Sequence, residues 1–458
     1  MTISERLGGG SAKGKLYSSS SNLGQVGSLE GDSEGENELK TLRNQVVQQL
    51  AIQFGSLMND SRQSRRDLEN KVVEAVAFVI DNGNHSLPKI NRADLVQGLV
   101  DDLIGNGPIE PFLRDPSVTE IMVNRFNQVF IERDGKIFPA GIEFHDEEHL
   151  RSTIERIVSR VGRRIDESSP MVDARLPDGS RVNAVIAPIA LDGSSLTIRK
   201  FANEALSIQD LIANETITQE AAHFLESCIQ GKLNVVISGG TGSGKTTTLN
   251  VMASFIPPSE RIITIEDSAE LQLNKPHVIR LESRPLNVEG RGLVSIRDLV
   301  RNSLRMRPDR IVIGEVRDGT AFDMLQAMNT GHDGSMTTVH ANTPTDALTR
   351  IESMSLMAGM EIPLQVIREQ ISQSINLVLQ QSRLADGSRK ITSILEIDGF
   401  SNGELHHKEI FRFNFGNRNE NGSTGKLEFT GTKSTAGSKI RSRGVACDET
   451  YFEFNNHG

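Results

Sequence analysis

The stretch that decides the fold runs from Val235 to Thr246 and reads VVISGGTGSGKT. A short run of β-branched residues is followed here by a glycine-rich loop that ends in lysine and threonine. The spacing from Gly239 to Thr246 matches G-x-x-x-x-G-K-[ST], a loop whose backbone N–H groups wrap phosphates while its lysine reaches the β and γ oxygens. The sequence therefore predicts a nucleotide-binding site at this loop.

The flanking sequence supplies the context that this motif requires. An apolar strand precedes the loop, and a helix-compatible stretch at 247–256 follows it and stops at two prolines. A structural glycine turn is the weaker alternative, because strand, loop and helix occur in the right order. We expect the nucleotide to be held by Gly239, Gly240, Thr241, Gly242, Ser243, Gly244, Lys245, Thr246 and Thr247. Thr246 should also hold Mg²⁺.

Length and charge restrict the classes of protein. A chain of 458 residues is long enough for about three domains. The 50 Lys+Arg and 60 Asp+Glu give a net charge of -10, which disfavours a general nucleic-acid coat but leaves room for a local basic channel. Cys228 and Cys447 lack C-x-x-C spacing and fit a reducing compartment without a zinc site. Since no stretch approaches the roughly 18 apolar residues of a membrane span and no signal pattern begins the chain, we expect a cytoplasmic protein.

Composition and periodicity divide the chain into five parts. Residues 1–36 are rich in Gly and Ser and then acidic, which predicts a flexible, disordered tail. Apolar residues at helical spacing in 37–108 predict a three-helix unit. Residues 109–205 mix strand, hairpin and helix signals and predict a smaller α/β domain, and 206–415 form the domain that carries the loop. Residues 416–458 match no pattern that assigns them a role, and we treat them as a variable extension.

The region after the loop predicts the fold class. Strand-like apolar runs at 262–265, 311–313 and 335–339 alternate with helical stretches. Such runs are typical of parallel strands that helices cover on both faces. We therefore predict an α/β protein with a parallel-rich sheet around the phosphate loop.

Acidic residues end two of these strands. Glu266 and Asp267 follow one strand and Glu315 follows another, at the position where nucleotide enzymes place metal ligands and water-activating groups. We expect Glu315 to orient or deprotonate the attacking water, while Glu266 and Asp267 share that role or bind the metal. The alternative is that these acids cap the following helices, an interpretation that is stronger for Asp267 than for Glu315.

Two histidines and an arginine-rich helix leave alternatives open. His332 and His340 stand at either end of a glycine turn and a strand, where each could donate to a phosphate or be a satisfied structural group. Ser295 can begin a helix with arginines at four-residue steps, namely Arg297, Arg301 and Arg305. These arginines could be solvated, or they could contact phosphates or a neighbouring subunit.

Four motifs in this order resemble those of one family. They are the phosphate loop at 239–246, the acidic box ITIEDSAEL at 263–271, the Walker B stretch LRMRPDRIVIGEVRD at 304–318 and the histidine box TGHDGSMTTVHAN at 330–342. The set is similar to that of secretion ATPases of the type II/type IV superfamily. The stretches at 158–175 and 323–334 further resemble the CpaF branch, the motor of tight-adherence (Flp, type IVc) pili.

The resemblance implies a ring-forming ATPase, usually a homo-hexamer. Its RecA-like P-loop domain would be preceded by the smaller α/β domain and the three-helix unit, with ATP and Mg²⁺ bound between the α/β and RecA-like domains. The family's pattern assigns hydrolysis to Glu266 and Glu315 and nucleotide contact to His340. It further implies that arginines of the smaller domain approach the phosphates together with Lys245; these are Arg175, Arg181 and Arg199.

The implied function is an ATP-hydrolysing motor at the cytoplasmic face of the inner membrane. The motor would associate with the membrane through platform proteins and drive assembly of a pilus, with retraction as a second possible action. Three alternatives stay open: a type IV secretion ATPase that moves protein or DNA, a RecA-like DNA motor, and a nucleotide-dependent scaffold with little turnover. No stable nucleic-acid complex is expected. The four-cysteine zinc site of some pilus ATPases is absent from the sequence, as in the CpaF branch.

Overall fold

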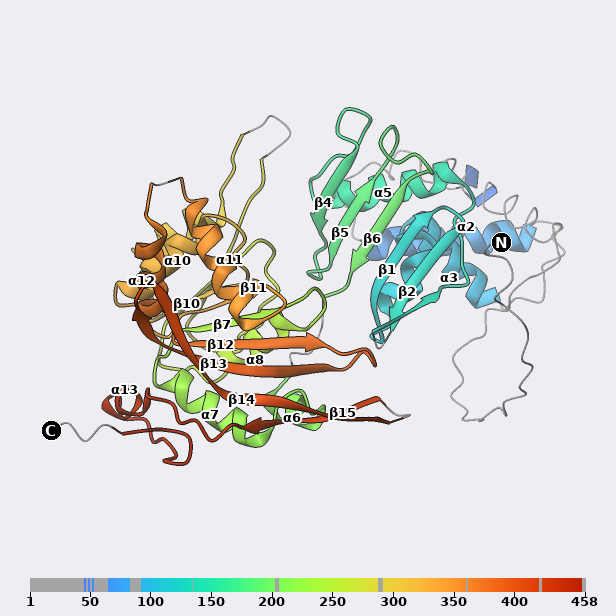
Figure 1. Ribbon diagram of the computed structural model, residues 1–458. Helices are drawn as coiled ribbons and strands as arrows, with labels where there is room; N and C mark the ends of the chain where they lie inside the picture. Colours follow the sequence, from blue (N-terminus) through green and yellow to red (C-terminus); the bar gives the residue numbers. More distant parts are fainter. Residues whose placement is uncertain are drawn as a thin grey trace, which may run out of the picture. The chain divides into compact units, whose positions relative to one another are not determined.

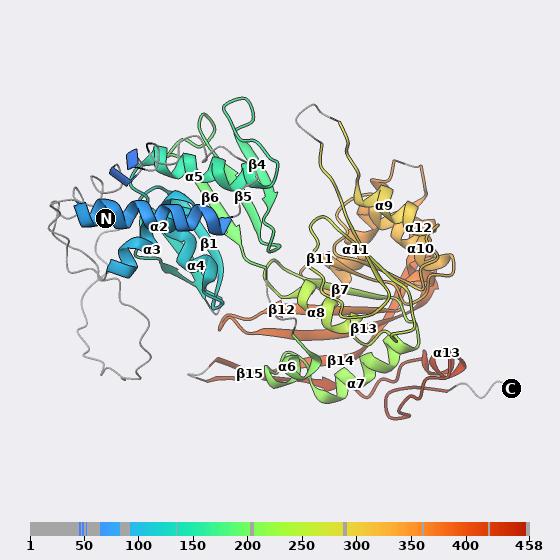
Figure 2. The same cartoon turned by 180° about the vertical axis from the view of Figure 1, so that it is seen from behind.

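The computed structural model describes residues 45, 46, 48, 49, 52, 65–82, 92–133, 135–201, 206–286, 291–359, 361–419 and 422–454. The predicted tail at 1–36 lies outside these residues. The chain forms two compact units, one of Met1–Glu110 with Gly141–Phe144 and the other of Pro111–Ala140 with His145–Gly458. Figures 1 and 2 show the elements from opposite sides.

The first unit is helical. It contains α2 (Arg65–Asn82) and α3 (Arg92–Leu103), and the short helix η2 (Gly107–Ile109) follows. Apolar side chains at three- and four-residue steps form its core; they are Val46, Val72, Ala75, Val76, Val79, Leu99 and Val100. The chain turns sharply at Gly107, whose φ of 70° is a value that residues with a side chain rarely adopt.

The second unit begins with α4 (Glu110–Arg114) and an antiparallel sheet of six strands in the order β3-β2-β1-β6-β5-β4. The strands are β1 (Val118–Arg125), β2 (Gln128–Arg133), β3 (Lys136–Pro139), β4 (Met171–Arg175), β5 (Arg181–Val185) and β6 (Ser195–Arg199). The helix α5 (Glu147–Arg160) lies between β3 and β4 in the chain and is capped by Asp146. Register places Arg181 opposite both Arg175 and Arg199, so the three predicted arginines share one end of three adjacent strands.

A sheet of nine strands carries the phosphate loop, in the order β15-β14-β13-β12-β7-β11-β10-β8-β9. The strands are β7 (Val235–Gly239), β8 (Ile262–Glu266), β9 (Val278–Glu282), β10 (Arg310–Ile313), β11 (Met336–His340), β12 (Leu377–Arg383), β13 (Arg389–Ser401), β14 (Glu404–Asn419) and β15 (Gly422–Phe429). The six strands from β12 to β9 are parallel, and β13 to β15 add antiparallel pairs. The predicted α/β class with a parallel-rich, RecA-like sheet is confirmed. The carboxyl ends of the parallel strands meet at one edge.

Helices cover both faces of this sheet. They are α6 (Ile208–Ala213), α7 (Gln219–Gln230), α8 (Lys245–Ala253), α9 (Ile296–Ser303), α10 (Thr320–Asn329), α11 (Pro344–Leu356) and α12 (Leu364–Ser374). Along β7, Val235 and Ile237 pack with α7 and α8, whereas Val236 packs with α10, α11 and α12. Both faces of β7 are therefore buried, as expected for a central parallel strand.

Residues 208–230 form two helices, α6 and α7, with a turn between them. The chain leaves α6 at Asn214, and Glu215 has a φ of 52°, in the left-handed region that ends a helix. Thr218 then starts α7 by accepting a hydrogen bond from the N–H of Ala221. A turn at Glu215 therefore separates the two helices, which apolar spacing alone does not register.

The sheet continues past residue 415, where the sequence placed the end of the domain. The strand β15 pairs with β14, and the helix α13 (Gly437–Ser442) follows. Ile440 and Phe452 are buried in the same core as α7, and the ring of Phe452 stacks on Phe224 with centroids 5.0 Å apart. Much of the segment 416–458 therefore belongs to the packed core of the nine-stranded sheet.

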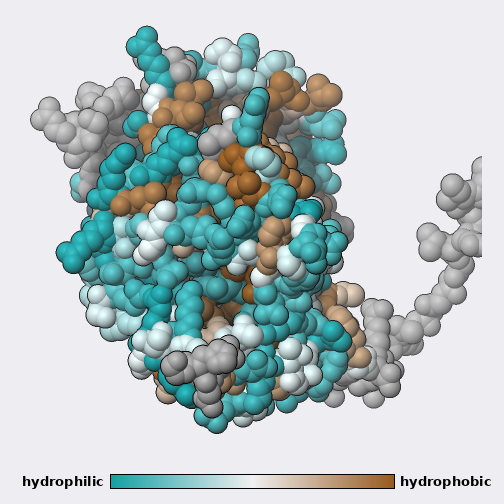
Figure 3. All heavy atoms as spheres, turned by 60° about the vertical axis from the view of Figure 1, so that its left-hand side comes forward, coloured by the Kyte–Doolittle hydropathy of each residue, from teal (hydrophilic) through white to brown (hydrophobic). Residues whose placement is uncertain are grey.

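The surface is mostly hydrophilic on the face shown in Figure 3, where apolar side chains gather mainly in the upper half. Large apolar residues are exposed around the connection of α11 to α12, namely Leu356, Met357, Leu364 and Val366. Among the helices in the described part of the chain, none combines the length and the apolar character needed to cross a membrane.

Candidate active site

The phosphate loop joins β7 to α8, as the motif predicts. Gly242 and Gly244 have φ values of 69° and 94°, which glycine adopts without strain. A side chain at Gly239 would overlap the backbone oxygen of Gln381, so close approach of β12 explains this glycine. Backbone geometry therefore explains why glycine occupies these three positions of the loop.

Lys245 begins α8 and points back along the loop. Its Nζ donates to the carbonyl oxygen of Gly240 at 2.9 Å, an oxygen that also accepts from the hydroxyl of Ser243 at 2.9 Å. Burial lowers the pKa of Lys245, and the positive charges of Arg317 and Arg199 lower it further, against the opposing charge of Glu315. A phosphate in the loop would relieve this excess of positive charge.

A cleft of about 610 Å³ opens at the carboxyl ends of the parallel strands. The predicted residues that line it are Thr241, Gly242, Gly244, Lys245, Thr246, Thr247, Glu266, Asp267, Glu315, His340, Arg181 and Arg199. Four other predicted residues do not line it, namely Gly239, Gly240, Ser243 and Arg175. The fold thus brings most of the residues singled out from sequence to one cleft.

Glu266 ends β8 and is only 2% exposed. One carboxylate oxygen accepts the backbone N–H groups of Glu270 at 2.7 Å and Leu271 at 3.0 Å, and the other has no hydrogen-bond partner among the described residues. Burial raises the pKa of Glu266, and the two backbone hydrogen bonds partly offset that effect. One carboxylate oxygen of Glu266 therefore stabilises the following turn, and the second is available to a ligand.

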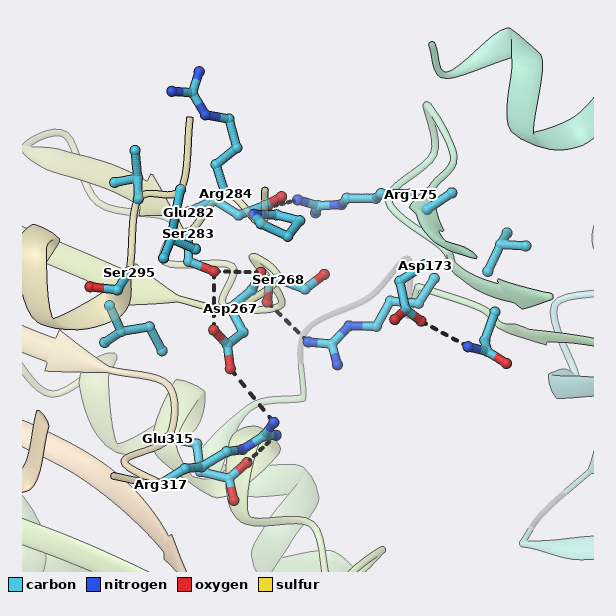
Figure 4. A pocket seen from close by; sticks show the side chains of 18 of the residues that line it. Asp173, Arg175, Asp267, Ser268, Glu282, Ser283, Arg284, Ser295, Glu315 and Arg317 are labelled. Atoms are coloured by element: carbon cyan, nitrogen blue, oxygen red, sulfur yellow. Dashed lines mark hydrogen bonds and ion pairs between the residues drawn. The ribbon is translucent and has the colours of Figure 1, made fainter. Parts of the chain in front are cut away.

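Glu315 follows β10 and is bound by a neighbour that sequence reasoning gave no role. An oxygen of its carboxylate accepts from the guanidinium of Arg317 at 2.7 Å, and that guanidinium also lies 3.6 Å from Asp267. Figure 4 shows Arg317 between the two carboxylates. The hydrogen bond to Glu315 raises the pKa of Arg317.

The capping alternative fails for Glu315 in this structure. Asp318, three residues later, accepts from the N–H and hydroxyl of Thr320, the first residue of α10, at 2.8 and 2.6 Å, so Asp318 and not Glu315 lies next to the start of that helix. Asp267 accepts from the hydroxyl of Ser283 at 3.0 Å. Glu315 therefore faces the cleft with no helix to cap.

The oxygen-rich side chains of the cleft fit a magnesium ion. Thr246, Glu266 and Asp267 all line it, and hydroxyl and carboxylate oxygens are the ligands that Mg²⁺ prefers. The buried carboxylate oxygen of Glu266 that has no hydrogen-bond partner among the described residues can serve as a ligand for the ion. When bound, the ion would supply positive charge opposite the phosphates.

The two histidines differ in position. His340 ends β11 beside Gly239 of β7 and lines the cleft. Burial and the charge of Lys245 lower the pKa of His340, so its imidazole is neutral at pH 7 and can donate one N–H. His332 does not line the cleft.

Two of the three arginines of the six-stranded sheet bind the loop that follows Glu266. Arg175 donates to the carbonyl of Ala269 at 2.6 Å and pairs with Glu282, as Figure 4 shows. Arg181 donates to the carbonyl of Ser268 at 3.1 Å and lies 3.0 Å from Glu270. These contacts hold the acidic loop against β4 and β5.

Arg199 differs from the other two arginines. It lines the cleft with Lys245, and its guanidinium makes no hydrogen bond or ion pair within the part of the chain that the structure describes. Its positive charge is close enough to lower the pKa of Lys245. Of the three, Arg199 is the one whose guanidinium makes no hydrogen bond to the acidic loop, although its charge also acts on Glu120, its neighbour on β1.

The arginines of the arginine-rich helix bind an acidic side chain of the same chain, which neither interpretation of the sequence predicted. Arg297 and Arg301 of α9 both bind the carboxylate of Asp323 on α10, at 2.5 and 2.9 Å. They join two helices of one chain and are not in the phosphate cleft. Sequence spacing showed the shared face of α9 but not its acidic partner.

Several residues near the cleft were not singled out from sequence. Arg317 stands two residues after Glu315 within the motif and bonds to it, a nearness that was present in the sequence. Arg350 of α11 lines the cleft beside His340. Arg389 donates to the carbonyl of Gly242 from a distance of 147 residues along the chain, for which no local signal exists.

Comparison with known proteins gives three findings. A family model described as "Type II/IV secretion system protein" matches residues 102–423. The conjugal transfer protein TrbB of Rhizobium radiobacter is 33% identical over 312 residues, which cover 65% of this chain and 90% of that protein. The type IV secretion system protein VirB11 of Bartonella quintana (strain Toulouse) is 33% identical over 330 residues, 63% of this chain and 90% of that protein.

A solved structure is also similar. The crystal structure of the VirB11 ATPase from the Brucella suis type IV secretion system, in complex with sulphate, is 30% identical. The match covers 63% of this chain and 94% of that chain with a TM-score of 0.35.

Proposed function

Because the chain belongs to the type II/IV secretion system protein family, we propose that it is an ATP-hydrolysing motor. The motor assembles as a homo-hexamer at the cytoplasmic face of an inner membrane and acts on platform proteins there. It powers the assembly of a tight-adherence type IVc pilus, and its retraction in a second mode. The stretches at 158–175 and 323–334, which resemble the CpaF branch, support this choice of machine.

One observation carries the proposal: the phosphate loop and the carboxylates of two parallel strands line the same cleft. Lys245 and the loop N–H groups bind the phosphates. Glu315 orients or deprotonates the attacking water, and Thr246, Glu266 and Asp267 hold the magnesium ion. His340 donates its N–H to the nucleotide, and Arg199 approaches the transferred phosphate.

The two engaged arginines connect this chemistry to movement. Arg175 and Arg181 bind the acidic loop whose backbone N–H groups bind Glu266. A change in the metal or phosphate at Glu266 therefore reaches the six-stranded sheet through one short loop. Such a contact can couple hydrolysis to domain movement.

A second candidate is a type IV secretion ATPase that moves protein or DNA. The names of the two relatives above, a conjugal transfer protein and a type IV secretion protein, favour it. It uses the same cleft and the same chemistry and differs in the machine that the motor drives. A scaffold with little turnover is the third candidate.

The test is ATP turnover in the presence of Mg²⁺. Lys245→Ala should abolish turnover because the phosphates lose their cationic partner, whereas Lys433→Ala, at an exposed lysine outside the cleft, should match wild type. Equal rates in wild type and Lys245→Ala would overturn the site. Wild type without measurable turnover would favour the scaffold, and stimulation by single-stranded DNA would favour the secretion ATPase.

Assembly is tested separately. Sedimentation of wild type with a non-hydrolysable ATP analogue and Mg²⁺ should show a hexamer. A monomer at every protein concentration tested would contradict the ring. The symmetry of trapped particles would then show which subunit supplies each arginine to a given cleft.

A further inference from the structure

The hairpin of β12 and β13 packs against the phosphate loop. The carbonyl of Gln381, near the end of β12, lies so close to Gly239 that no side chain fits there. The amide Nε2 of Gln381 would lie 3.1 Å from a β-carbon at Gly244. Because Gln381 is only 2% exposed, β12 forms a close-fitting wall behind the loop.

Arg389, the first residue of β13, binds the loop directly. Its Nε donates to the carbonyl oxygen of Gly242 at 3.1 Å. In a planar trans peptide the next N–H points opposite to the carbonyl, so holding this oxygen fixes the direction of the N–H of Ser243. That N–H makes only a long 3.4 Å bond to Gly240 and is therefore available to an anion in the loop.

Arg383, the last residue of β12, reaches in the other direction. One terminal nitrogen donates to the carbonyl of Gly135, in the turn between β2 and β3, at 2.6 Å. The other would lie 3.5 Å from a β-carbon at Gly242. A single guanidinium thus adjoins both the turn of the six-stranded sheet and the tip of the phosphate loop.

We infer that this arginine hairpin, meaning β12 and β13 with Arg383 and Arg389, positions the phosphate loop for nucleotide and ties it to the β2–β3 turn. Arg389 is a positioning residue that acts through the Gly242 peptide. Arg383 couples the conformation of the phosphate loop to Gly135, because its guanidinium has separate N–H donors that can face the loop and the turn. The inference rests on the proposed binding of nucleotide at the loop.

The first experiment measures ADP affinity by isothermal titration calorimetry. Arg389→Ala should weaken binding roughly tenfold through loss of a charged hydrogen bond, and Arg389→Lys, which keeps a donor and a charge, should recover part of that loss. The matched control is Arg412→Ala, which removes an exposed arginine from β14 that pairs with Glu409. It should bind as wild type.

Thermal unfolding without nucleotide separates positioning from folding. If Arg389 positions the loop, the unfolding midpoint of Arg389→Ala without ADP stays at the wild-type value while the rise caused by ADP shrinks. Affinity within twofold of wild type would overturn the role of Arg389. A lower midpoint without ADP, with unchanged affinity, would make the arginine merely structural and would also overturn it.

The second experiment follows the tie to the β2–β3 turn by hydrogen exchange of residues 128–139. ADP should change exchange there in wild type and in Arg412→Ala, but not in Arg383→Ala. An identical response in Arg383→Ala, or none in wild type that binds ADP, would overturn the tie. Wild type that fails to bind ADP would overturn the proposed function itself, so the two failures are distinguishable.

Discussion

The two sheets of the second unit present their site residues in different ways. In the nine-stranded sheet, β8 and β10 pair in parallel with Ile265 opposite Ile313, so the acids that follow each strand emerge side by side. In the six-stranded sheet, register gathers three arginines at one end, but side-chain contacts decide what each one binds. Two are bound to the acidic loop and Arg199 is not.

The difference concerns what holds a functional group in place. Backbone pairing holds Glu266 and the strand that leads to Glu315, and it does not change unless the sheet unfolds. Arg175 and Arg181 are held by ion pairs and carbonyl contacts on partly exposed side chains, which can exchange partners when a phosphate arrives. Changes in the parallel sheet should therefore remove chemistry or folding, and changes at the arginines should weaken the response to nucleotide.

Among the changes that test this comparison, the largest effect should come from Glu315→Gln. Removing a general base should lower turnover by about 100- to 10,000-fold while ATP-analogue affinity stays within a few-fold of wild type. Steady-state turnover and equilibrium titration measure the two quantities. Glu404→Gln, at an exposed glutamate on β14, is the control. A loss of less than tenfold in Glu315→Gln would mean that another acidic residue acts as the general base. It would contradict the catalytic role assigned to the acid that follows β10.

A buried ion pair at the opposite end of β10 tests the rigidity of the parallel sheet. Arg310 is 0% exposed and pairs with Glu260. Arg310→Ala empties a fully buried site and removes one of two cationic partners of Glu260, which keeps Lys232 at 3.7 Å, and should cost about 2–5 kcal/mol of unfolding free energy. Arg133→Ala removes the partly exposed pair of Arg133 and Asp115 from the six-stranded sheet and should cost at most about 1 kcal/mol. Denaturant unfolding measures both, and equal losses would contradict the contrast.

Arg199 tests whether an arginine of the six-stranded sheet takes part in the response to nucleotide. Arg199→Ala should lower kcat/KM for ATP by about 10- to 100-fold, the loss expected when a charged hydrogen bond of ~1.5–3 kcal/mol disappears. Arg199→Lys should restore part of the activity because the charge remains. Arg151→Ala on α5, where Arg151 pairs with Glu155 on the surface, is the control. Unchanged kinetics in Arg199→Ala would show that its open guanidinium has no part in hydrolysis.

Local patterns predicted the strands around the phosphate loop well, namely β7, β8, β10 and β11, but not the other strands of the nine-stranded sheet. The phosphate loop, the parallel strands and the two acidic strand ends each depend on residues within a few positions of one another, and each was found at the expected place. Strand pairing then brought Glu266 and Glu315 to the same cleft. Functional residues at the carboxyl ends of parallel strands are predictable because the sheet itself brings those ends together.

Contacts between distant segments were not predictable. Asp323 meets Arg297 only because α9 packs on α10, and Arg389 meets Gly242 only because β13 follows β12 beside β7. No spacing along the chain encodes either pair. The left-handed residue Glu215 and the packing of Phe452 depend on tertiary structure in the same way.

The smallest effect should be a gain in stability from Glu266→Gln. Because burial raises the pKa of Glu266 above its usual 4.5, the unfolded chain loses this proton first as the pH rises, and wild type loses stability above pH 4.5. Glutamine does not titrate, so the variant should unfold at a higher temperature at pH 7 and at the same temperature below pH 4.5. The gain should stay below the ~2–4 °C that 1 kcal/mol represents, since the amide nitrogen would also lack a partner.

Glu396 on β13 makes the matched control. It is 4% exposed, its pKa is likewise raised by burial, and it accepts from Thr435 far from the cleft. Glu396→Gln should show the same dependence of the unfolding midpoint on pH and should keep wild-type turnover, whereas Glu266→Gln should lose turnover because the phosphate site loses an acid. If both variants kept full turnover, Glu266 would be only the acceptor for the turn at Glu270, and Glu315 would be the single essential carboxylate of the parallel sheet.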